Sequence, residues 1–194
     1  MPPQFDINGL RNKLDSIELL LKTHKHASFD LTTPLTNLDF NLIARTSLGA
    51  AASSIVLDGI SPRRFLRILI EHDAKSGNGN SLLRFNNDAA GNYTFIENGN
   101  NTARTSQTSV DLLDGANNSL GYFYIIDVIN IFNLVKAVRA DAVARIGAAS
   151  TAQTRHRITG TWVNTTALIT RVDLVASANN LPSGTTLSIY GSRD

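Results

Sequence analysis

The sequence predicts an all-β fold: an antiparallel jelly-roll sandwich preceded by a short N-terminal α-helix. After about residue 38, apolar and polar residues alternate in short runs bounded by clusters of Gly, Asn, Asp and Ser, as expected for strands and turns. No stretch there shows the strand–helix alternation of a parallel α/β sheet. A long series of such strands without a helical interruption indicates a sandwich or a jelly roll.

The predicted helix occupies residues 1–26 and carries one apolar seam. Asp6 is placed to cap its first turn. The seam residues recur at alternating spacings of three and four, the a and d pattern of a coiled coil: Ile7, Leu10, Leu14, Ile17 and Leu21. The helix either packs against copies of itself or lies on its own domain, and Leu19 and Leu20 favour the wider face of the second arrangement. If the helix packs against copies of itself, the mixed Ile and Leu of the seam fit three strands, and so a homotrimer, at least as well as two.

A polar connector is predicted over residues 27–39, where Pro34 and its neighbours stop any helix. His24 and His26 precede it. In a threefold bundle these imidazoles could ring the axis and bind a metal or an anion. The pattern favours the simpler interpretation that they are histidines facing solvent at a helix end.

Residues 40–194 are predicted to form the jelly-roll domain. Ser76–Asn80 has the composition of a turn and is predicted to join its flanking strands as a hairpin. No repeat of fixed period is present, which argues against a propeller or a solenoid. The predicted strands are Phe40–Thr46, Ser53–Leu57, Phe65–His72, Ser81–Phe85, Tyr93–Ile96, Gly121–Asn130, Leu134–Ala140, Ala142–Ile146, His156–Val163, Leu168–Ala176 and Thr185–Tyr190.

The composition points to no particular class of partner. The net charge is only +2, and the closest grouping of basic residues, Arg63, Arg64 and Arg67, is too short for the basic stripe of a nucleic-acid groove. No stretch is apolar enough to span a bilayer, and the N-terminus lacks the features of a secretory signal. The sequence contains no cysteine, which excludes disulfides and thiolate metal sites. We expect neither nucleic-acid binding nor membrane insertion.

A search for catalytic constellations also points away from enzymes. The four histidines fall in no helical metal motif, and no Gly-x-Ser-x-Gly elbow or phosphate loop is present. Asp127 interrupts an apolar run, so it either faces solvent by alternation or makes a buried pair with an arginine. Trp162 is interpreted as a core anchor rather than as a stacking platform for sugar. We expect no catalytic activity, no cofactor and no metal.

Several segments between about residue 50 and about residue 191 form an ordered series of motifs. They are Ile55–Ser61, Phe65–Ile70, Leu83–Asp88 with Asn92-Tyr93, Ile158–Trp162, Ala167–Val172 and Leu181–Gly191. The third is similar to an "RFN-D…NY" stretch, and the last to an "SG-TSLYG" ending. Together they resemble a family of small jelly-roll structural proteins of tailed bacteriophages. This resemblance implies a virion component, often trimeric, found in tail fibres, in baseplates or on capsids, and it implies no catalytic residues.

The resulting expectation is a non-enzymatic virion structural protein, assembled in the host cytoplasm. As a trimeric tail-fibre, tail-tip or baseplate component, it would bind other virion proteins and contact host surface glycans. A trimeric capsid decoration protein is the first alternative. A cellular carbohydrate-binding module comes next, and a glycan hydrolase is ranked last because no carboxylate pair stands out in the sequence.

Overall fold

The computed structural model describes residues 40–97, 103–112, 120–145 and 155–192. This part of the chain is all-β, and every strand pairing in it is antiparallel. The strands are β1 (Phe40–Ser47), β2 (Ser54–Leu57), β3 (Phe65–His72), β4 (Ser81–Phe85), β5 (Tyr93–Glu97), β6 (Arg104–Gln107), β7 (Val110–Asp111), β8 (Gly121–Ile129), β9 (Lys136–Arg145), β10 (Arg155–Trp162), β11 (Val172–Ala176) and β12 (Thr186–Ser192).

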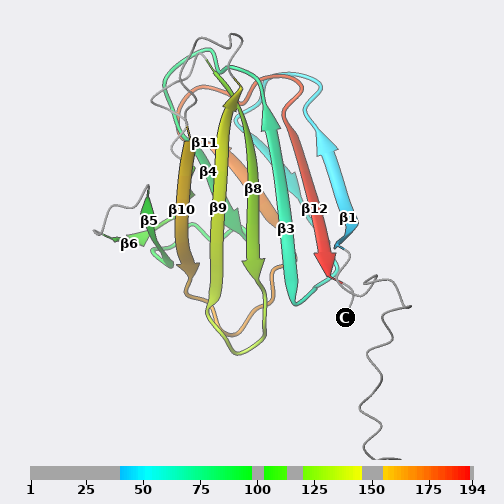
Figure 1. The fold of residues 1–194 in the computed structure, drawn as a ribbon, viewed down its shortest axis with the longest axis vertical. Coiled ribbons are helices and arrows are strands. Elements are labelled where there is room, and N and C mark those ends of the chain that lie inside the picture. The colour runs from blue at the N-terminus through cyan, green and yellow to red at the C-terminus, as the bar shows by residue number, and fades with distance from the viewer. Residues whose placement is uncertain (1–39, 98–102, 113–119, 146–154, 193–194) are drawn as a thin grey trace, which may run out of the picture. The chain divides into compact units, whose positions relative to one another are not determined.

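The strands form two sheets of unequal size. The large sheet has eight strands in the order β1-β12-β3-β8-β9-β10-β5-β6, and the small sheet has four in the order β2-β11-β4-β7. Figure 1 shows the strands of the large sheet from β1 to β10 side by side, with β4 and β11 behind them. Strands far apart in the sequence are therefore neighbours, as in β1 and β12.

The core lies between the sheets because alternate residues of strands such as β3, β4 and β8 point inward. In β3, Leu66, Ile68 and Ile70 are buried while the residues between them are not. The small sheet contributes buried residues of the same kind, such as Leu83 and Leu174, to the same apolar cluster. Both sheets thus share one core. The large sheet packs one face against this core and turns its other face outward.

Most predicted strand boundaries lie within one or two residues of the observed ones, but two predictions are clearly wrong. Leu134–Ala140 and Ala142–Ile146 were predicted as separate strands, but β9 runs continuously through Asp141. Asp141 faces outward in this strand, so the carboxylate does not interrupt it. The strand predicted from Leu168 begins only at Val172, because the Asn86 side chain binds the backbone of the preceding residues: its Nδ2 donates to Leu168 O, and its Oδ1 accepts from Thr170 N and Arg171 N.

The predicted hairpin at Ser76–Asn80 is also wrong, because the strands that flank it, β3 and β4, belong to different sheets. The Asn179 side chain donates to Asn78 O at 2.6 Å, and the Lys75 ammonium donates to Gly79 O at 2.7 Å. These bonds hold the segment as a crossing between the layers. Two short strands, β6 and β7, were not predicted at all.

Candidate functional site

The predicted oligomer seam, Ile7, Leu10, Leu14, Ile17 and Leu21, lies outside the described residues. The whole predicted helix at 1–26, the connector at 27–39, and His24 and His26 lie outside them as well. The described residues direct attention instead to the outward face of the large sheet.

This outward face carries an unusual share of apolar side chains. Phe65 of β3, Ile125 and Ile129 of β8, and Val143 of β9 are each between 39% and 44% exposed. A sheet face in contact with water usually presents polar residues at these alternate positions. Exposed apolar residues that recur on neighbouring strands mark an interaction surface.

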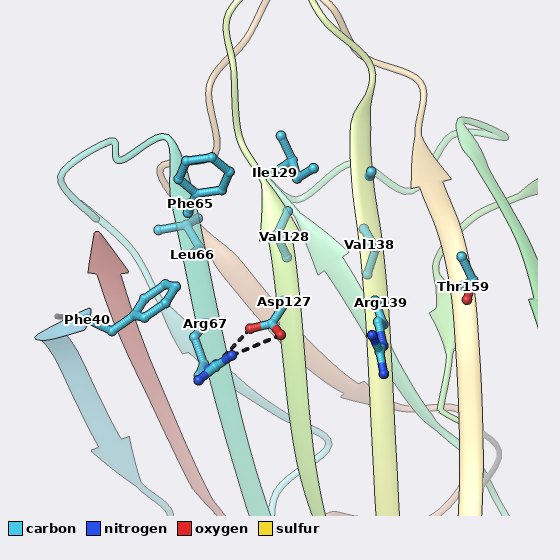
Figure 2. A pocket seen from close by; sticks show the side chains of 11 residues that line it. Phe40, Phe65, Leu66, Arg67, Asp127, Val128, Ile129, Val138, Arg139 and Thr159 are labelled. Carbon is cyan, nitrogen blue, oxygen red and sulfur yellow. Dashed lines mark hydrogen bonds and ion pairs between the residues drawn. The ribbon is translucent and has the colours of Figure 1, made fainter. Parts of the chain in front are cut away.

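A hollow of about 370 Å³ opens on this face at the end where β3 begins and β8 ends. Figure 2 shows its walls and floor: Phe40 and Phe65 stand on one side, Ile129 rises from β8, and Arg139 and Thr159 lie on the other side. The adjoining residue of β9 is Ala137, whose short side chain leaves space beside Ile129. The volume lies within the usual range for small-ligand sites.

An ion pair crosses the floor of the hollow. The guanidinium of Arg67 donates to both carboxylate oxygens of Asp127, from Nε at 2.7 Å and from Nη2 at 3.0 Å (Figure 2). The hydrogen bond to Asp127 raises the pKa of Arg67. The same guanidinium lies 4.9 Å from the ring centroid of Phe40, a cation–π distance. Of the two interpretations for Asp127, the outward position by alternation is confirmed. The buried pair is wrong, because the carboxylate does pair with an arginine but is 46% exposed.

Beside the hollow, three arginines converge on one carboxylate. Arg155 and Arg157 of β10 each donate to Oδ1 of Asp141, at 3.1 and 3.0 Å, and Arg139 of β9 donates to Oδ2 at 3.1 Å. Burial alone would raise the pKa of Asp141, but the hydrogen bonds from Arg157 and Arg155 hold it below its usual value. We call Arg139, Arg155 and Arg157 the arginine cluster. Together with Asp141 it carries a net charge of +2.

Sequence reasoning missed this cluster although a signal was present. Arg139 and Asp141 are two residues apart, as are Arg155 and Arg157, so each pair faces one side of a strand. The antiparallel register of β9 and β10 then places Asp141 opposite Arg157. The sequence prediction divided β9 into two strands at Asp141, and for that reason it could not give this register.

Trp162 is fully buried, so its predicted role as a core anchor is confirmed. Its ring lies 5.7 Å from Phe85 and 6.4 Å from Tyr93, measured between centroids. Its Nε1 donates to Asp88, which also accepts from the side chain of Asn92. The "RFN-D…NY" motif thus serves the packing of the interior.

A second aromatic group is buried between the sheets. His72 lies 6.0 Å from the rings of Tyr122 and Tyr124, and His156 lies 5.7 Å from Tyr122. All four side chains are buried. Within the described residues, no three His, Cys, Asp or Glu side chains are grouped so that they could hold a metal ion.

Comparisons of the chain with protein-family models, with curated proteins and with solved structures return no match. Among the described residues, no helix is long and apolar enough to cross a membrane. The functional interpretation therefore rests on the fold and on the outward face of the large sheet.

Proposed function

We propose that this chain is a non-enzymatic structural protein of a tailed-bacteriophage virion. In this proposal a trimeric jelly roll forms part of a tail fibre, tail tip or baseplate and contacts host surface glycans. The observation that carries the proposal is the nested pairing of its strands.

When β5, β6, β9 and β10 are set aside as insertions, eight strands remain, and they pair from the outside of the chain inward. β1 pairs with β12, β2 with β11, β3 with β8 and β4 with β7. Successive pairs alternate between the large and the small sheet. One long hairpin wrapped around a core would produce this order, and we therefore assign a jelly roll, the fold that the phage resemblance implies.

The insertions support a role in contact with other molecules. β9 and β10 widen the large sheet and supply the arginine cluster, so the outward face extends beyond the strands of the basic jelly roll. Exposed apolar residues and arginines on one face are typical of interaction surfaces. Such a surface suits either a neighbouring virion protein or a glycan.

The first test is the mass of the purified full chain in solution. Light scattering should give about three times the 21.0 kDa mass of one chain. Leu14→Asp places a charge in the predicted seam and should dissociate the trimer, whereas Ser16→Asp adds the same charge outside the seam and should leave it intact. A monomer for the unmodified chain at micromolar concentration would overturn the trimer.

The second test is the presence of the chain in purified phage particles. Mass spectrometry should detect it, and gold-labelled antibody on intact particles should mark the tail. Labelling of the shell would instead assign the chain as a capsid decoration protein. Absence from the particles would overturn the virion role and favour a cellular carbohydrate-binding module.

A further inference from the structure

We infer that the arginine cluster and the adjoining hollow bind an anionic saccharide, a sugar chain that carries carboxylate or phosphate groups. This inference rests on the proposed function and deepens it, because it names the ligand class of the glycan-contacting surface and the residues that would hold the ligand.

The first argument is charge. Arg67, Arg139, Arg155 and Arg157 pair on this surface with two carboxylates, those of Asp127 and Asp141. One arginine would neutralise Asp141, yet three are directed at it. Exposed ion pairs contribute little to stability, so fold stability does not explain the excess. The sequence between β9 and β10, residues 146–154, carries no charged residue that would offset it.

The second argument is the geometry of the donors. A guanidinium has five N–H groups in a planar fork that matches the oxygens of a carboxylate or a phosphate. The side chains of Arg139 and Arg155 are 62% and 60% exposed while bound to Asp141. Asp141 thus orients the two guanidinium groups without enclosing them, and an incoming anion meets donors whose positions are already fixed.

The third argument is that the arginine cluster and the apolar hollow are continuous with each other. Arg139 belongs to both, because it donates to Asp141 and also lines the hollow. Figure 2 shows the rings of Phe40 and Phe65 at the opposite side of this hollow. The C–H faces of a sugar ring pack against aromatic rings, while its acidic substituent requires a cation. The aromatic rings and the arginines Arg67 and Arg139 all line this one hollow, which has the volume of a small-ligand site.

The test is a calorimetric titration of the full chain with matched pairs of sugars. Tetragalacturonate supplies carboxylates, and its full methyl ester has the same sugar backbone without charge. Glucose 6-phosphate and glucose form the corresponding phosphate pair. We expect heat of binding for a charged member only, and the pair that responds identifies the source of the anion. Raising NaCl from about 50 mM to about 500 mM should weaken the binding severalfold.

Two variants assign the binding to the cluster. Arg139→Gln and Arg155→Gln should each raise the dissociation constant roughly tenfold, since each removes a charge-assisted contact. Arg104→Gln is the matched control, because Arg104 pairs with Glu97 on β5 and β6, at the edge of the large sheet and outside the arginine cluster. This variant should bind the sugar as the unmodified chain does. Thermal melts of the three variants should coincide with that of the unmodified chain.

Three outcomes would overturn the inference: equal binding of the charged and neutral members, no binding of any probe, or the same loss in Arg104→Gln as in the cluster variants. A sheet face that serves copies of this chain would instead show a lower oligomer mass for Arg139→Gln and Arg155→Gln, with no sugar binding. Presence in phage particles is measured separately, so a chain found in particles that binds no anionic sugar refutes this inference alone.

Discussion

The indole Nε1 of Trp162 donates a 2.7 Å hydrogen bond to Oδ2 of Asp88, 74 residues earlier in the chain. The same carboxylate accepts hydrogen bonds from Asn92 Nδ2 and Ala90 N, each at 2.9 Å. Asp88 therefore fixes the turn between β4 and β5 and ties it to the end of β10. The contact joins two of the sequence motifs, Leu83–Asp88 and Ile158–Trp162, so residues of both stabilise the same part of the fold.

The Trp162–Asp88 bond should be measurable as a coupling energy. Trp162→Phe keeps an aromatic ring but removes the donor, and Asp88→Asn keeps the shape but removes the charge. Each should lower the free energy of unfolding by about 1–3 kcal/mol in urea titrations. The double variant should lose less than the sum, by at least about 0.5 kcal/mol. Strict additivity would mean that the two side chains act independently.

Stability should fall on acidification, with Asp88 as one cause. Burial would raise the pKa of Asp88, but the hydrogen bonds from Asn92, Trp162 and Ala90 lower it below its usual value. A carboxyl with a lowered folded pKa stabilises the protein above its unfolded pKa, and this stability is lost as the pH falls through the folded value. Urea midpoints between about pH 6 and about pH 3 should therefore decline less for Asp88→Asn than for the unmodified chain. Parallel declines would exclude this role of Asp88.

Lys136 should contribute more to the free energy of unfolding than a residue at a strand end usually does. Its side chain is fully buried, and Nζ donates to Leu134 O at 2.8 Å and to Asn164 O at 2.9 Å. Burial lowers the pKa of this ammonium group. Lys136→Ala should lower the free energy of unfolding by about 2–4 kcal/mol, because it leaves a cavity and removes the donor from two carbonyls. Val135→Ala, at an exposed neighbour, should cost less than about 1 kcal/mol in the same urea titration.

A side chain at Gly160 should destabilise the fold. A Cβ atom there would lie 2.5 Å from Thr94 O and 2.7 Å from Phe95 Cβ, on the paired strand β5. Gly160→Ala should therefore lower the melting temperature by several degrees, equivalent to about 1–3 kcal/mol of overpacking. Gly49→Ala is the matched control, since a Cβ at Gly49 meets nothing within 4 Å. Equal melting temperatures for the two variants would contradict the close approach of β5 and β10.

The sequence predicted the strands that alternate strongly and failed where the alternation is short or irregular. β3 was predicted at both of its ends, because Leu66, Ile68 and Ile70 alternate regularly with less buried residues. β6 has the sequence Arg-Thr-Ser-Gln and β7 only two residues, so neither presents an apolar face that a pattern could reveal. The late start of β11 depends on hydrogen bonds from Asn86, which lies more than 80 residues away in sequence.

The candidate site was less predictable than the strands because it depends on register across neighbours. Asp127 was singled out and an arginine partner was considered for it, but nothing in the sequence identified Arg67 as that partner. The arginine cluster needs the pairing of β9 with β10, and the hollow needs β1, β3, β8 and β9 in their final order. These arrangements depend on how the strands pair in the folded sheet, and the sequence alone gives only a weak signal for that pairing.

The place of β12 in the large sheet affects how the protein is made. β12 lies between β1 and β3, yet it follows them by more than 110 residues in the chain. Until residues 186–192 leave the ribosome, both earlier strands lack their shared neighbour and present unpaired edges. Folding of the large sheet must then finish after synthesis of its last strand, at the slow rates typical of long-range strand pairing. Nascent chains that stall before β12 should be the form most exposed to aggregation and proteolysis in the cell.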